Sequence, residues 1–212
     1  MIAIDGPAGS GKSTVARAVA ARLGLDHLDT GAMYRSVAFA ALRDGIDPAD
    51  EAAVADLARR LEIEVAERVQ VDGADATDAI RGATVSLAVS AVAQNSEVRA
   101  ELVRRQRAWM ADRSGGVMEG RDIGSVVLPD ADVKVYLTAS DEERARRRAT
   151  EAGQPDAEAV AADMARRDQL DATRAASPMV IAAGAVVIDT TGRSVTEVVD
   201  AVLALLPTGE RR

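Results

Sequence analysis

Residues 6–13 read Gly6-Pro7-Ala8-Gly9-Ser10-Gly11-Lys12-Ser13, which fits the pattern G-x-x-x-x-G-K-[ST] of a phosphate-binding loop, or P-loop. In such a loop the glycines let the backbone wrap so that successive N–H groups point at phosphate oxygens, and the following helix adds the positive end of its dipole. Lys12 can then reach the β- and γ-phosphates of a nucleoside triphosphate, and the Ser13 hydroxyl can bind Mg²⁺. The alternative is a glycine-rich turn that matches the pattern by chance. We favour triphosphate binding because the motif follows a predicted strand and opens a predicted helix; the motif does not identify the acceptor.

The segments around the loop predict an α/β fold. Residues 2–4 form a short apolar run, as a buried strand does, and apolar residues recur at helical spacing from Lys12 to Leu23. We predict further strands at 117–118, 133–137 and 186–188, and further helices at 32–43, 49–61, 85–93, 96–113, 140–150, 156–176 and 194–206. Ser140 with Glu143, and Ser194 with Glu197, have the spacing of capping boxes. Strands that alternate with helices indicate a parallel sheet with helices on both faces, which is a three-layer P-loop fold.

One stretch departs from this alternation. Residues 63–65 and 69–71 alternate apolar and polar side chains and are followed by Asp72-Gly73, which predicts a half-exposed antiparallel hairpin. We therefore predict a small antiparallel insertion near 62–83.

Composition excludes several classes of function. The net charge of −8 repels polyanions, and the aromatic side chains are few, namely Tyr34, Phe39, Trp109 and Tyr136, so we expect no nucleic-acid partner. The chain has no cysteine and a single histidine, His27, which excludes thiolate and multi-histidine zinc sites. No run approaches the roughly 18 apolar residues of a membrane helix. We expect a cytoplasmic protein without a membrane partner.

Several arginines suggest an acceptor that itself carries a phosphate, because the planar guanidinium binds two oxygens and stays charged. They are Arg35, Arg99, Arg121, Arg167 and Arg174. Each alone is more often a solvated surface arginine. Arg35 and Arg121 stand out because they lie beside glycine-bearing turns at the ends of predicted elements, where the sites of parallel α/β sheets occur.

A second group of arginines follows the predicted strand at 133–137. It consists of Arg144, Arg146, Arg147 and Arg148. One interpretation is an exposed helix face paired with Glu142 and Glu143. The other is a closing lid whose arginines neutralise charge on the phosphoryl group in transfer.

Taken together, the motifs resemble those of the bacterial cytidylate kinase family, within the nucleoside-monophosphate kinases. The segments that carry the resemblance are IDGPAGSGKST at 4–14, LDTGAMYR at 28–35, EGRDIGSVVLPDA at 119–131, LTASDEERARRR at 137–148 and RRDQLDATRAASP at 166–178. They cover nearly the whole chain, and the second and third are specific. The insertion near 62–83 also resembles the extra piece of bacterial members, although it is a few residues shorter here.

The resemblance implies a role for each matching position. Residues Gly6 to Thr14 bind ATP. The acceptor phosphate is bound by Thr30, Arg35, Arg121 and Arg174. The cytosine edge is bound by Ser90, Arg99 and Asp122, and the ribose by Arg167 and Asp171. The predicted catalytic residues are Lys12, Arg121, Arg144 and Arg148. An Asp122 carboxylate can accept from the exocyclic amine of cytosine, whereas uracil presents a carbonyl there. The metal residues are Ser13 and Glu119, the latter acting through water.

Two strand-end carboxylates compete for the magnesium role. Asp189 ends the run Val186–Ile188 and Glu119 ends the run Val117-Met118, so both look like a Walker B residue. The wider kinase superfamily favours Glu119, and we place Asp189 in a loop near the adenine. His27 is given no role.

The resemblance implies the reaction ATP + CMP to ADP + CDP, with dCMP as a second acceptor, in a monomer. It also implies a core P-loop domain of residues 1–33, 101–140 and 166–212, a monophosphate-binding region at 34–100 and a lid at 141–165. The alternatives are a P-loop kinase for another monophosphate or for shikimate, and a nucleotide switch or nucleic-acid-stimulated ATPase. A catalytically dead relative is disfavoured by the intact Lys12 and Ser13.

Overall fold

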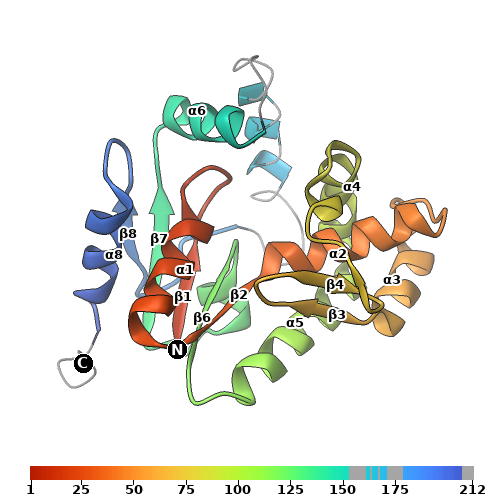
Figure 1. The fold of residues 1–212 in the computed structure, drawn as a ribbon, viewed down its shortest axis with the longest axis horizontal. Coiled ribbons are helices and arrows are strands. Elements are labelled where there is room, and N and C mark those ends of the chain that lie inside the picture. The colour runs from red at the N-terminus through yellow and green to blue at the C-terminus, as the bar shows by residue number, and fades with distance from the viewer. Residues whose placement is uncertain (153–160, 163, 167, 171–178, 207–212) are drawn as a thin grey trace. The chain divides into compact units, whose positions relative to one another are not determined.

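The computed structural model describes the chain apart from residues 153–160, 163, 167, 171–178 and 207–212 (Figure 1). Its contacts divide the chain into two compact units. The first unit consists of residues 1–27 and 115–212, and the second of residues 28–114.

The chain forms a five-stranded sheet with the order β2-β6-β1-β7-β8, and all of its strands except β2 lie wholly within the first unit. The strands are β1 Ile2–Asp5, β2 Asp26–Asp29, β6 Gly116–Gly120, β7 Val133–Thr138 and β8 Val186–Asp189. β1 pairs in parallel with β6 and β7, and β7 with β8. Every residue of β1 is buried, so its carboxyl end delivers the chain from the middle of the sheet directly into the P-loop. The predicted parallel α/β fold is confirmed.

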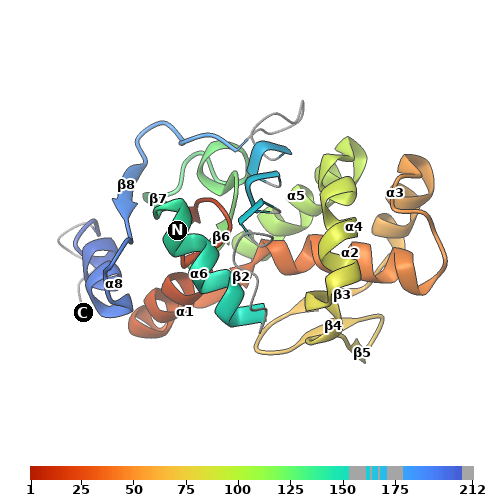
Figure 2. The same ribbon diagram turned by 90° about the horizontal axis from the view of Figure 1, so that it is seen from above.

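Helices cover this sheet. α1 Lys12–Leu23 begins inside the P-loop motif, buries its apolar side against the sheet and ends at Gly24, which has a left-handed φ of 63°. α8 Val195–Leu203 packs beside α1, as Figures 1 and 2 both show, and its predicted capping box is present in full. α6 Asp141–Ala152 follows β7 and lies beyond the carboxyl end of that strand (Figure 1).

The capping box predicted for α6 is only half formed. The backbone N–H of Glu143 donates to the Ser140 hydroxyl at 3.3 Å, but the Glu143 carboxylate accepts from Arg146 and Arg147 instead of returning to Ser140. The Ser140 N–H donates to the Thr191 hydroxyl. Two guanidinium groups on the next turn compete more strongly for the carboxylate than one neutral amide does.

The second unit is a helical cluster with a small antiparallel sheet. Its helices are α2 Thr30–Arg43, α3 Glu51–Arg60, α4 Ala83–Gln94 and α5 Ser96–Ala111, with a short 3-10 turn at Ala79–Arg81. Side chains of Asp29, Asp50 and Asn95 cap α2, α3 and α5. The sheet contains β3 Ile63–Val65, β4 Val69–Val71 and β5 Ala74–Asp75, and confirms the predicted insertion with one strand more than expected.

β2 and a π-helical turn at Ile123–Val127 that follows β6 were also not predicted. The helix predicted at 156–176 falls largely outside the described residues, although 161–162, 164–166 and 168–170 are helical. Among the described residues, no helix has the length and apolar character needed to cross a membrane. The predicted domain boundaries and the lid stay predictions.

Candidate active site

The P-loop takes backbone conformations that require glycine at two positions. Gly6 has a φ of 150°, and a Cβ there would lie 2.1 Å from the Leu137 carbonyl oxygen. Gly9 has a φ of 72°, and its Cβ would lie 2.7 Å from the Arg144 carbonyl oxygen. Both separations are far inside van der Waals contact. The loop is therefore packed against the end of β7 on one side and the first turn of α6 on the other.

The lysine and serine of the motif lie at the start of α1. Lys12 Nζ donates to the Pro7 carbonyl oxygen at 2.8 Å, so its side chain folds back over the loop. Ser13 Oγ donates to Glu119 Oε2 at 2.8 Å. The sequence prediction paired Ser13 with Glu119, and the structure brings the two together.

Glu119 lies on β6 and is 2% exposed. Its second oxygen, Oε1, lies 3.2 Å from His27 Nε2, so the histidine that was given no role contacts the predicted metal carboxylate. Asp189 behaves differently. It accepts from the backbone N–H and the hydroxyl of Thr191, and these hydrogen bonds lower its pKa. Among the described residues, no group of three His, Cys, Asp or Glu side chains forms a metal site.

Asp5 is a second buried carboxylate at the base of the loop. It is 4% exposed and accepts from the backbone N–H groups of Ile123 at 2.7 Å and Gly124 at 2.8 Å. Burial raises its pKa to about 6, against the opposing effect of these two hydrogen bonds. Asp5 thereby attaches the unpredicted π-helical turn to the end of β1. The only signal in the sequence was its position directly before Gly6.

Asp168 is the centre of an ionic cluster beside the loop. Arg121 donates to the Gly6 carbonyl oxygen at 3.2 Å and to Asp168 Oδ1 at 3.3 Å. Arg144 donates to the Ala8 carbonyl oxygen at 3.0 Å and to Asp168 Oδ2. The Ala8 N–H donates to Asp168 Oδ1 at 3.3 Å. Two of the predicted catalytic arginines therefore converge on the P-loop through a carboxylate that sequence reasoning missed.

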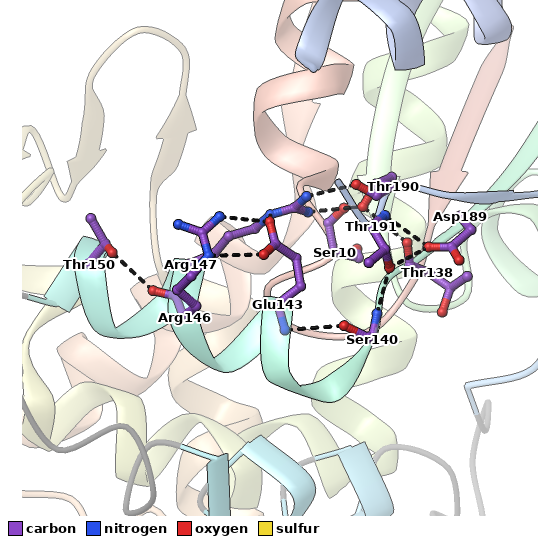
Figure 3. A network of polar contacts seen from close by, with 10 residues as sticks. All are labelled: Ser10, Thr138, Ser140, Glu143, Arg146, Arg147, Thr150, Asp189, Thr190 and Thr191. Atoms are coloured by element: carbon purple, nitrogen blue, oxygen red, sulfur yellow. Dashed lines mark hydrogen bonds and ion pairs between the residues drawn. The ribbon is translucent and has the colours of Figure 1, made fainter. Parts of the chain in front are cut away.

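The arginines at the start of α6 differ in their surroundings, and the lid interpretation stays a prediction. Arg146 pairs with Glu143 and is exposed, as an ordinary helix face would be. Arg144 is buried against the loop, and Arg147 donates to the hydroxyl and the carbonyl oxygen of Thr190, which follows β8 (Figure 3).

The second unit holds several residues predicted for the acceptor. Arg35 Nη2 donates to Asp29 Oδ2 at 2.8 Å, while Asp29 Oδ1 accepts from the backbone N–H of Ala32 and caps α2. Arg99 is 3% exposed and lies over the ring of Tyr34, with 5.5 Å between its Cζ and the ring centroid. Each arginine is thus held in place by another residue of its own unit.

The other predicted residues are placed as follows. Thr30 at the start of α2 and Asp122 after β6 are buried, and Ser90 on α4 and Arg148 on α6 are half-buried. Arg167, Asp171 and Arg174 lie outside the described residues.

Known proteins resemble this chain in sequence and in fold. The family model of cytidylate kinase matches residues 2–208. A cytidylate kinase of Desulfitobacterium hafniense is 51% identical over 96% of this chain and 91% of that protein, and one of Pelotomaculum thermopropionicum is 50% identical over 99% and 97%. An uncharacterized protein from Eubacterium ventriosum, known from a crystal structure, shares the fold with a TM-score of 0.56 and 12% identity, covering 96% of this chain and 95% of that one. The chain therefore belongs to the cytidylate kinase family.

Proposed function

We propose that this protein transfers the γ-phosphoryl group of ATP to CMP, giving ADP and CDP, and that dCMP is a second acceptor. The observation that carries the proposal is the family match over residues 2–208, on a chain whose P-loop keeps Lys12 and Ser13. An oxygen of the acceptor phosphate forms a bond to the γ-phosphorus while the bond from that phosphorus to the β–γ bridging oxygen breaks, and ADP leaves. That oxygen is already anionic, so no side chain has to act as a nucleophile or strong base.

The P-loop residues from Gly6 to Thr14 bind the triphosphate. The left-handed φ values of Gly9 and Gly11 support this assignment, because such turns direct backbone N–H groups toward one point. Lys12 already lies over the loop at the Pro7 carbonyl oxygen, and we expect it to turn from there onto the β- and γ-phosphates.

Ser13 and Glu119 are the residues that would hold Mg²⁺. Their oxygens lie 2.8 Å apart, and hydroxyl and carboxylate oxygens are the ligands this ion prefers. When bound, the ion neutralises charge on the β- and γ-phosphates. The contact between His27 and Glu119 supports the assignment, because a second hydrogen-bond partner fixes the orientation of the carboxylate.

The acceptor phosphate is assigned to Thr30, Arg35, Arg121 and Arg174, and the ribose to Arg167 and Asp171, on the motifs that carry them. The pairing of Arg35 with Asp29 supports its assignment, because a guanidinium held by one carboxylate keeps further N–H groups for phosphate oxygens. We assign Arg144 and Arg148, in a lid at 141–165, to the phosphoryl group in transfer.

Base recognition is assigned to Ser90, Arg99 and Asp122. A carboxylate at Asp122 accepts from the amine of cytosine, and the carbonyl of uracil would leave two acceptors facing each other. The burial of Asp122, which is 5% exposed, supports this role, because an unmatched polar pair discriminates strongly only where water cannot replace the missing partner.

A coupled assay of ADP release tests the proposal across CMP, dCMP, UMP, AMP and shikimate, with Lys12→Ala as the blank. We expect the highest kcat/KM with CMP and dCMP. A higher value with AMP or shikimate would overturn the acceptor assignment. ADP release at the same rate with and without an acceptor would identify a nucleotide-hydrolysing switch or ATPase instead.

A further inference from the structure

Thr190 lies directly after β8 and is almost fully buried next to the P-loop (Figure 3). Its Oγ1 lies 3.1 Å from the carbonyl oxygen of Ser10 and 3.0 Å from that of Thr138. Its backbone N–H also donates to the Thr138 carbonyl oxygen, at 2.8 Å. One threonine therefore joins the end of β7, the end of β8 and the P-loop.

Arg147 on α6 determines how this hydroxyl is used. Nη1 of the guanidinium donates to Thr190 Oγ1 at 2.9 Å, and Nη2 donates to the Thr190 carbonyl oxygen at 2.8 Å. Nε donates to Glu143 Oε1 at 2.8 Å, which fixes the plane of the guanidinium. Because a guanidinium only donates, Thr190 Oγ1 accepts from Arg147 and keeps its single proton for a carbonyl oxygen. Thr138 already accepts the backbone N–H of Thr190, so the Ser10 carbonyl is the acceptor that depends on this proton.

The orientation of the Ser10 carbonyl matters for the loop. In a planar trans peptide the C=O and the following N–H point in opposite directions. A Ser10 carbonyl held toward Thr190 therefore turns the N–H of Gly11 away from Thr190, toward the inner side of the loop. Gly11 has a φ of 88° and is the residue before α1, where backbone N–H groups bind phosphate.

We propose that Thr190 and Arg147 are positioning residues for the triphosphate: together they hold the Ser10–Gly11 peptide in the orientation that binds phosphate. The inference rests on the proposed function only in taking the P-loop ligand to be ATP. It gives Arg147 a role different from that of a lid arginine that reaches the phosphoryl group. We call the connected residues Arg147, Thr190 and Ser10 the brace. The brace also links α6 to the loop, since Arg147 lies on α6 and Ser10 in the loop.

Thr190→Val tests the brace, because it keeps the branched shape of the side chain and removes the hydroxyl. We expect the Kd and the KM for ATP to rise about three- to tenfold, the effect of one lost hydrogen bond, while the KM for CMP stays within about twofold. Thr190→Ser should restore both values for ATP. Thr191→Val is the matched control, because the Thr191 hydroxyl contacts Asp189 and the Ser140 N–H and not the loop; its Kd for ATP should match the wild type.

A double-mutant cycle extends the test to Arg147. Arg147→Gln should raise the Kd for ATP, and combining it with Thr190→Val should add little, because both variants break the same connection. If the effects of the two substitutions on the Kd for ATP were fully additive, the shared brace would be refuted. A Thr190→Val variant that unfolds at a lower temperature but binds ATP like the wild type would also refute it. Binding of ATP is measured without an acceptor. A failure of the CMP assay would therefore refute the proposed function and leave this result standing.

Discussion

The close approach of α6 to the P-loop gives a prediction about Gly9→Ala. Gly9 has a φ of 72°, and an added Cβ would lie 2.7 Å from the carbonyl oxygen of Arg144 and 3.0 Å from its Cα. Gly24, at the end of α1, is the matched control. Its φ of 63° is similar, and no heavy atom of the described residues lies within 4 Å of a Cβ built there.

Both substitutions strain the backbone, but only Gly9→Ala also causes a steric overlap. Placing alanine in the left-handed region costs about 1–2 kcal/mol at either position. At Gly9 the backbone of α6 must also move, and such overpacking costs about 1–3 kcal/mol more. We therefore expect the free energy of unfolding to fall by about 1–2 kcal/mol in Gly24→Ala and by about 2–5 kcal/mol in Gly9→Ala. In a chain of this size each kcal/mol lowers Tm by about 2–4 °C.

Thermal unfolding and ATP kinetics of both variants measure the difference. Because moving Arg144 disturbs its contact with the Ala8 carbonyl oxygen, Gly9→Ala should also raise the KM for ATP, whereas Gly24→Ala should keep it. If Tm falls by the same amount in both variants and Gly9→Ala keeps the wild-type KM for ATP, α6 does not pack on the loop as it does in the structure. That result would refute the reasoning.

Three further predictions concern charged side chains. Lys12→Ala should keep its Tm and lose about two or more orders of magnitude in kcat/KM, and near wild-type turnover would remove the P-loop from the mechanism. The Asp5 carboxyl should titrate near pH 6 by carbon NMR, and a midpoint near 4 would refute this. Since its folded pKa lies above the unfolded value of 3.8, its contribution to the free energy of unfolding falls by about 2 kcal/mol as pH rises from 4 to 6. Asp122→Asn should lower the preference for CMP over UMP by about 1–3 kcal/mol in relative kcat/KM, and an unchanged ratio with both rates reduced would place base reading elsewhere.

Local pattern predicted most of the fold because apolar spacing and caps are local signals. The structure has α1 at the predicted residues, Lys12 to Leu23, and it confirms the capping box at Ser194. β2 was missed because it reads Asp-His-Leu-Asp and only Leu28 in it is buried, so it has no apolar run. A strand at the edge of a sheet can be stabilised by backbone pairing without such a run.

The candidate site was predicted where its residues belong to a motif and missed where one distant contact defines them. Ser13 and Glu119 were paired through the motifs that carry the family resemblance, and the structure joins them by a hydrogen bond. Asp5 and Thr190 could not, since Asp5 acts on the backbone of residue 123 and Thr190 on that of residue 10. Backbone C=O groups are present at every residue and N–H groups at every residue except proline, so no residue type in the sequence marks them as partners.

The outer side of the P-loop explains how a chain with net charge −8 can hold a triphosphate. Loop carbonyl oxygens accept from side chains in the pairs Gly6 with Arg121, Pro7 with Lys12, Ala8 with Arg144, and Ser10 with Thr190. Because the Gly6–Pro7 peptide has no N–H and the Ala8 N–H donates to Asp168, the effect on the N–H groups is confined to the other two peptides. The Ala8 and Ser10 carbonyls, turned toward their donors, turn the following N–H groups the other way. Two N–H groups of the loop are thus oriented before any ligand arrives, which favours an anion over a cation without reorganisation at these two peptides. Arg144 lies on α6, Arg121 after β6 and Thr190 after β8, each more than a hundred residues from the loop carbonyl that it contacts. The orientation of the loop peptides therefore depends on distant segments of the chain. A loop excised with α1 alone would lose this orientation.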